Sequence, residues 1–135
     1  MDRNLQILGL AKKAGLLAVG SEDTGAASRS GKARLVLSSH DASAGALRRA
    51  RNSASICSAP HVIAPYSSFE LGSVSGRGSP GTVAILETGL AARFMEGLAA
   101  IDPERFGEPA ELLMRKTRAH AESKKRNPSG KRRTV

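Results

Sequence analysis

Aromatic side chains are scarce in this chain, which has no tryptophan, one tyrosine and three phenylalanines among 135 residues. Sheets that read single-stranded nucleic acids stack bases on several aromatic side chains at fixed spacing. That spacing is absent, which argues against single-strand recognition by an RRM-like or OB-like sheet. Cys57 is the only cysteine, so no disulfide can form within the chain, and a reducing cytosol fits this composition.

Long apolar runs are also missing. The longest uninterrupted one is Leu16–Val19, far short of the roughly 20 residues that span a bilayer. No apolar core of a signal peptide is visible either. We therefore expect a soluble, cytoplasmic protein that makes no contact with a membrane.

Positive charge is in excess, with 21 Lys and Arg residues against 12 acids and a formal net charge of +9. Residues 112–135 hold nine bases and one acid, which is +8, whereas residues 1–111 hold 12 bases and 11 acids. A basic end of this kind is typical of an arm that binds a polyanion. We predict one domain over residues 1–101 and a basic tail over residues 102–135, with a helix from past Pro109 to about Ala121 and disorder from Lys124.

Helical and strand patterns alternate over the first hundred residues. Helices are predicted from residue 4 to Gly15, from a Ser21 cap to Gly31, from a Ser43 cap, from the Ser67–Glu70 capping box, and around Leu90–Leu98 before Asp102-Pro103. Strands are predicted at Leu16–Val19, Arg34–Ser38, His61–Ala64 and Thr82–Leu86, with a loop over Gly72–Gly81. This alternation predicts an α/β domain with helices on both faces of a small, mostly parallel sheet.

The junction Gly20–Asp23, between the first strand and the second helix, is the first candidate site. The first turn of a helix leaves backbone N–H groups without intrahelical partners. Glu22 and Asp23 either complement the helix dipole, which is the commoner role, or accept hydrogen bonds from amines and ring N–H groups of bases. Gly20 would let a nucleotide approach the backbone closely.

Three further features could contact nucleic acid. The glycine-rich segment Gly72–Ser79 lacks the Gly-Lys-Ser/Thr ending of a P-loop and leads into a strand, so a flexible connector is its default role. Arg77 at its tip is best placed to touch a phosphate. The basic face of the third helix and the basic tail are either solvated or bound to RNA or DNA. The helix face carries Arg48, Arg49 and Arg51.

Catalytic and metal chemistry find little support. Ser39, His40 and Asp41 are the residue types of a hydrolytic triad, but neighbours along a chain point apart and cannot form a hydrogen-bonded relay. The three histidines are scattered, and no Cys or His pair has metal-ligand spacing. We therefore expect no enzyme, no cofactor and no metal site.

Several segments taken in order resemble one protein family. They are Ile7–Gly15, Val19-Gly20, Ser30–Leu37, Asp41–Ser43 and Glu70–Gly72. They resemble the kink-turn RNA-binding ribosomal-protein family of the archaeal and eukaryotic large subunit, and in particular its small bacterial YlxQ-type members, over about residues 3–100. The resemblance implies a three-layer α-β-α sandwich with a four-stranded mixed sheet. It also implies a non-catalytic protein that binds structured, kink-turn-like RNA and is associated with ribosomes or translation.

In that family a turn reading Gly-Thr-Asn-Glu-x-x-Lys contacts the guanines of the kink-turn. By position Gly20 matches, Ser21 stands for the threonine and Asp23 for the glutamate, while Glu22 replaces the asparagine and Ala26 the lysine. The RNA-binding residues implied are Gly20, Ser21, Glu22, Asp23, Lys32, Arg77, Gly78 and Ser79. The alternative is a protein-interaction or assembly module whose RNA site has decayed. The sequence leaves the oligomeric state open.

Overall fold

Four strands form one mixed sheet in the computed structural model, which describes residues 2–76 and 78–126. The strands are β1 (Leu17–Val19), β2 (Leu35–Ser38), β3 (His61–Ile63) and β4 (Thr82–Ile85), in the spatial order β1-β4-β2-β3. β2 and β3 are parallel, whereas β4 runs antiparallel to both of its neighbours. The mixed sheet implied by the family resemblance is confirmed. The mostly parallel sheet predicted from the alternation is wrong, because β4 lies between β1 and β2 and opposes both.

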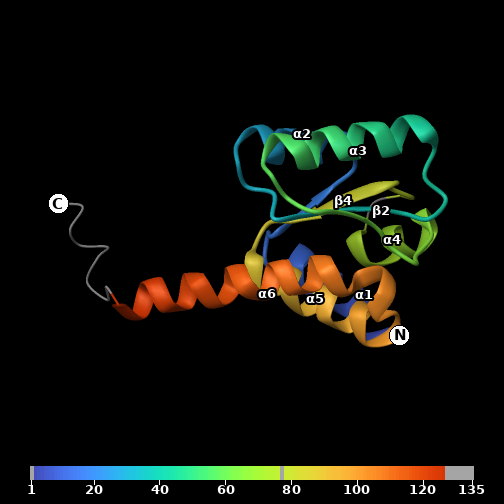
Figure 1. Cartoon of the computed structure of the whole chain (residues 1–135). Helices are drawn as coiled ribbons and strands as arrows, with labels where there is room; N and C mark the ends of the chain where they lie inside the picture. The colour runs from blue at the N-terminus through green and yellow to red at the C-terminus, as the bar shows by residue number, and fades with distance from the viewer. Residues whose placement is uncertain (1, 77, 127–135) are drawn as a thin grey trace.

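Helices cover both faces of the sheet, which makes the fold a three-layer α-β-α sandwich (Figure 1). α2 (Ser21–Arg29) and α3 (Ala44–Ile56) lie on one face. On the other face lie α1 (Arg3–Lys13), α4 (Ser68–Ser75), α5 (Thr88–Ile101) and α6 (Pro103–Arg126). Among the described residues, no helix combines the length and the apolar character needed to cross a membrane.

The two faces of the sheet have cores of different size. Strand residues alternate between faces, so Ala84 of β4 joins a thin layer of mostly alanines under α2 and α3, with Val36 as its largest member. Val83 and Ile85 point to the other face, where they join a larger core that includes Phe94 of α5. Small side chains let α2 and α3 lie close to the strands.

Most predicted helix starts are confirmed by their caps. The Ser43 hydroxyl accepts a hydrogen bond from the Ala46 N–H, and Ser67 and Glu70 form the expected capping box. The start of α2 differs from the prediction, because Ser21 is already helical and Gly20 is the capping position, without a side-chain hydrogen bond. The α2 N-terminus therefore relies on groups outside its own cap.

Gly72 belongs to α4, so the predicted loop over Gly72–Gly81 is wrong in its first four residues. A Cβ atom at Gly72 would collide with the carbonyl oxygen of Gly78. This glycine is needed because another segment of backbone lies against the helix, not because the helix ends there. The helix ends instead at Gly76, which has the left-handed conformation with φ +74°.

The helix predicted after Pro109 begins earlier, at Pro103, and extends to Arg126. Phe106, Ala110 and Leu113 of its first half lie in the main core. Residues 103–113, which the sequence assigned to the tail, are therefore packed with the rest of the domain. Residues 124–126, expected to be disordered, are helical, and residues 127–135 lie outside the described residues.

Candidate nucleic-acid interface

The Gly20–Asp23 junction lies where β1 ends and α2 begins. Gly20 has φ +94° and ψ 162°, a conformation open almost only to glycine. Its N–H donates to the Thr82 carbonyl at 2.8 Å, and its carbonyl accepts from the Thr24 N–H at 3.0 Å. The first of these bonds fastens the junction to the start of β4. A Cβ atom at Gly20 would meet nothing within 4 Å, so the backbone is open to an approaching ligand.

The side chains of this junction face solvent. Glu22 and Asp23 are exposed, and Ser21 is half-buried. Both acids lie in the first turn of α2, where the partial positive charge of the helix terminus favours carboxylates. The junction therefore combines backbone donors with carboxylate acceptors.

The loop before β4 lies at the same end of the sheet. Gly78 and Ser79 are exposed, and Ser79 precedes Thr82 by three residues, which spans at most about 10 Å of extended chain. Because Thr82 is hydrogen-bonded to Gly20, the fold brings the two predicted RNA-contacting segments together. Arg77, the phosphate-contacting candidate of this loop, lies outside the described residues.

Two loops that the sequence did not predict to contact RNA complete this end. The Ser39 N–H donates to the Gly81 carbonyl, and the His40 N–H donates to the Tyr66 carbonyl, both at 2.9 Å. The β2–α3 loop is thereby tied to the β4 start and to the β3–α4 loop. We call the end of the sheet where β1, β2 and β3 finish and β4 begins the Gly20 end. No local signal marks the meeting of these loops, because it follows from strand order.

Asp41 links two of these loops. Its carboxylate accepts from the Ser68 N–H at 3.0 Å and from the Ser68 hydroxyl at 3.2 Å. The nearby Ser39 side chain, and then the Ser68 N–H, lower the pKa of Asp41 by stabilising its ionised form. Asp41 precedes α3 in the chain, and its side chain is bound to the first turn of α4. This contact holds a carboxylate at the Gly20 end.

Lys32 lies away from the other predicted site residues. It follows α2, whereas Gly20 precedes it, and the nine residues of α2 separate the two by roughly 14 Å along the helix axis. Its N–H donates to the Ala27 carbonyl at 2.8 Å, and the residue is exposed. Lys32 therefore belongs to the opposite end of the sheet, where β2 begins and β4 finishes. We call this the Arg34 end.

The described residues contain no group of three or more His, Cys, Asp or Glu side chains that could hold a metal ion. His61 is half-buried and engages the Ser38 hydroxyl at 2.8 Å through Nε2. Burial, and then the positive charge of Arg51, lower the pKa of His61. This histidine joins β2 to β3.

Two buried hydroxyls flank the Gly20 junction. Thr24 Oγ1 and Thr82 Oγ1 have no hydrogen-bond partner within the described part of the chain. The backbone of both residues binds Gly20, so both belong to the framework of the junction. An unsatisfied buried hydroxyl costs about 1–3 kcal/mol, which is unusual enough to mark this region.

Fold and site together define an α-β-α sandwich whose loops gather backbone donors and carboxylates at the end of the sheet where three strands finish. No protein-family model matches the chain, and no curated protein matches it in sequence.

Solved structures share this fold. A protein of unknown function from Bacillus halodurans is 21% identical with a TM-score of 0.65, and the match covers 73% of this chain and 98% of that one. A 15.5 kD RNA-binding protein from Giardia lamblia is 18% identical with a TM-score of 0.55, covering 73% of this chain and 84% of that one. At these identities the matches show a common fold.

Proposed function

We propose that this protein is a non-catalytic RNA-binding protein that recognises structured, kink-turn-like RNA through its Gly20 end. We further propose that it acts on ribosomal RNA or another RNA of translation. The contacting residues would be Gly20, Ser21, Glu22 and Asp23, together with Gly78 and Ser79 of the loop before β4.

One observation carries this proposal: the hydrogen bond from the Gly20 N–H to the Thr82 carbonyl at 2.8 Å. It joins two segments that the sequence predicts to contact RNA, although they lie far apart in the chain. The positive φ of Gly20 keeps the backbone open where a base would approach. Fold similarity to a protein named as RNA-binding in Giardia lamblia supports the same class of ligand.

The chemistry of the junction suits guanine edges better than phosphates. Guanine presents N–H donors, and the exposed carboxylates of Glu22 and Asp23 are acceptors. A phosphate would be repelled by both acids. Because ionised Glu22 cannot donate as an asparagine would, and Ala26 carries no charge, two contacts of the family pattern are missing. At roughly 1–3 kcal/mol for each good base contact, we expect moderate rather than tight binding.

A direct test compares a kink-turn RNA with a straight duplex of the same length at two salt concentrations. We expect the full chain to bind the kink-turn RNA at least tenfold more tightly, with the ratio preserved at the higher salt concentration. Contacts to phosphates weaken with salt for both RNAs, whereas base contacts maintain the ratio. Equal weak binding to both RNAs that disappears on deleting residues 115–135, which leaves the buried Leu113 in place, would contradict specific recognition.

Restoring the family pattern distinguishes this function from the alternative of a decayed site. In the double variant Glu22→Asn, Ala26→Lys, kink-turn affinity should increase by roughly tenfold or more, because each restored contact contributes about 1–3 kcal/mol. The matched control is Glu96→Asn, Ala100→Lys on α5, which makes the same changes at the same spacing on exposed positions of the other helical layer and should leave the ratio of kink-turn to duplex affinity unchanged. If the natural chain binds no RNA and only the restored variant does, the protein-interaction alternative is favoured.

A further inference from the structure

α6 changes character along its length. Its first half, residues 103–114, has three acids and one base, and it buries Phe106, Ala110 and Leu113 at helical spacing. From Arg115 to Arg126 the helix has six bases and one acid, and no described side chain of residues 115–119 or 121 is buried. Figure 1 shows that this second half continues past the sheet on the side of the α2–β2 connection. We call residues 115–126 the projecting half of α6.

Among the side chains that the structure describes in the projecting half, those of residues 115–119 and 121, none is buried, so they gain little from packing. Short helices are marginal in water without a packed apolar face. Six positive charges within twelve residues favour the binding of a polyanion.

A second basic segment lies at the same end of the sheet. Arg29, Lys32 and Arg34, in or near the connection from α2 to β2, are all exposed. The Arg34 N–H donates to the Ile85 carbonyl at 2.9 Å, which holds this residue beside the end of β4. Its guanidinium also donates to the Gly31 carbonyl at 3.1 Å, which orders the side chain.

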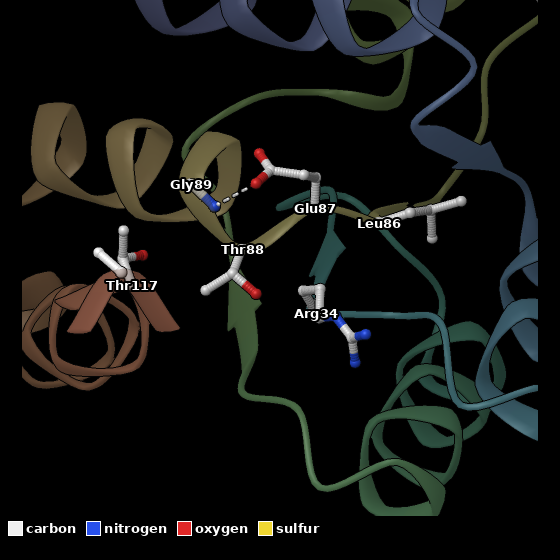
Figure 2. A pocket seen from close by; sticks show the side chains of 7 residues that line it. Arg34, Leu86, Glu87, Thr88, Gly89 and Thr117 are labelled. Carbon is white, nitrogen blue, oxygen red and sulfur yellow. Dashed lines mark hydrogen bonds between the residues drawn. The ribbon is translucent and has the colours of Figure 1, made fainter. Parts of the chain in front are cut away.

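A cleft joins the two basic segments. It has a volume of about 360 Å³ and lies between Arg34, which directly precedes β2, the residues Leu86–Gly89 where β4 leads into α5, and Thr117 and Ala121 of α6 (Figure 2). A neighbouring hollow of about 450 Å³ shares Glu87, Gly89 and Thr117 with it and adds Arg118. The two hollows therefore form one groove that passes from Arg34 to Arg118.

Glu87 is the acid of this cleft, and its carboxylate is engaged. One oxygen accepts from the Gly89 N–H at 3.0 Å (Figure 2), and the other accepts from the Leu90 N–H at 2.8 Å. These bonds cap α5, so the charge is directed to the helix terminus. The second hollow adds one more acid, Glu96, and the cations of the groove walls are Arg34, Arg93 and Arg118.

We propose that the groove, with Lys32 and the projecting half of α6, binds the sugar–phosphate backbone of an RNA segment separate from the one at the Gly20 end. This inference rests on the proposed function only in taking RNA as the ligand. Charge complementarity identifies the occupant, because Arg34, Arg93 and Arg118 come from three chain segments and line one groove, with Lys32 exposed beside Arg34 in the sequence. The two RNA surfaces lie at opposite ends of the sheet, so one protein molecule holds two RNA segments.

The test uses the full chain and a 20-base-pair RNA duplex without a kink-turn, titrated over a range of salt concentrations. In the variant Lys32→Gln, Arg34→Gln, Arg118→Gln we expect at least tenfold weaker binding at low salt. The slope of log K against log salt should become shallower by about 2–3, since each phosphate contact contributes roughly 0.9. The matched control, Arg48→Gln, Arg49→Gln, Arg51→Gln on the exposed face of α3, removes the same charge and should change both quantities much less.

The single variant Arg118→Gln keeps the hydrogen bond from Arg34 to Gly31, so it controls for a folding defect in the triple variant. It should show about a third of the triple variant's change in slope. Equal losses in the α3 control and the groove variant would overturn the proposal, and so would an unchanged slope. The ratio of kink-turn to duplex affinity reports separately on the Gly20 end. If the natural protein binds kink-turn RNA and duplex RNA equally well, the proposed function is contradicted. The groove proposal is still decided by comparing duplex binding of the groove variant with that of the α3 control.

Separate segments are tested by capture. Protein held on an immobilised kink-turn RNA should bind a labelled duplex, and the groove variant should lose that second RNA. If excess free kink-turn RNA prevents duplex binding, and each protein molecule binds only one RNA, the two surfaces cannot be occupied at the same time and the proposal is wrong.

Discussion

Gly20 offers the sharpest test of the candidate site, through the variant Gly20→Ala. Its φ of +94° and ψ of 162° lie in a region that is essentially restricted to glycine. Nothing lies within 4 Å of the position that a Cβ atom would occupy. Any loss of stability must therefore come from backbone strain, not from a steric clash.

The magnitude follows from that strain. A residue held in such a region costs about 1–3 kcal/mol. With an unfolding entropy of roughly 2.1 cal/mol/K per residue, a chain of this size loses about 3–4 °C of Tm for each kcal/mol. We expect the Tm of Gly20→Ala to fall by about 4–10 °C. Relaxation of φ would break the bond to Thr82, so the preference for kink-turn RNA should also fall.

Two other glycines serve as controls in the same thermal and chemical unfolding assays. Gly15 has φ +75°, in the ordinary left-handed region, so Gly15→Ala should cost about 1–2 kcal/mol. Gly107 lies inside α6 with nothing near its missing Cβ, so Gly107→Ala should stabilise by about 0.5–1 kcal/mol. Neither control should alter the ratio of kink-turn to duplex affinity.

The reasoning would be refuted if Gly20→Ala were as stable as the natural chain and kept its RNA preference. A loss of stability with an unchanged RNA preference would support the backbone strain at Gly20 but contradict its role in RNA binding. In that case Gly20 would be a structural glycine only.

Three more outcomes are expected from single positions. Burial, and then the hydrogen bond to Asp2, raise the pKa of Tyr66 to about 12. Between pH 10 and about pH 12 the folded chain keeps a proton that the unfolded chain loses, so the free energy of unfolding should fall over this range. The near-ultraviolet absorbance of this single tyrosine should show tyrosinate at pH 11 only after unfolding. Thr82→Val removes an unsatisfied buried hydroxyl, so the free energy of unfolding in urea should stay level or rise by up to about 1 kcal/mol, and a loss above that would mean that the hydroxyl is engaged. Leu113→Ala should cost about 2–5 kcal/mol because Leu113 is fully buried, whereas the half-buried Leu112→Ala should cost clearly less; equal costs would contradict the packing of α6.

The elements of the fold could be predicted largely from local patterns. The apolar strand cores, the Ser43 cap and the Ser67–Glu70 capping box are signals that lie within a few residues of each other, and the structure confirms them. Gly72 misled the prediction because glycine has two meanings in sequence. It marks a break in a helix, or it marks a place where another backbone comes close, and only the position of Gly78 decides which.

The candidate site was predicted in part. The Gly20–Asp23 junction and the loop at Gly78 and Ser79 were named from sequence, and the fold brings them to one end of the sheet. Lys32 was placed with them and lies at the other end. The β2–α3 loop, with Asp41 bound to Ser68, was missed because that contact joins residues of two separate connections.

The sequence by itself determined which segments are helices and strands, where several of them begin, and how charge is divided between the domain and its end. These properties depend on repeats of 2 and 3.6 residues and on capping side chains, all of which act within one turn or one strand. Tertiary structure alone decided that β4 runs between β1 and β2, that Gly20 meets Thr82, and that the first half of α6 packs into the core. The physical reason is that these contacts join distant residues, and their free energy depends on the packing of the whole sheet and its helices rather than on any local pattern.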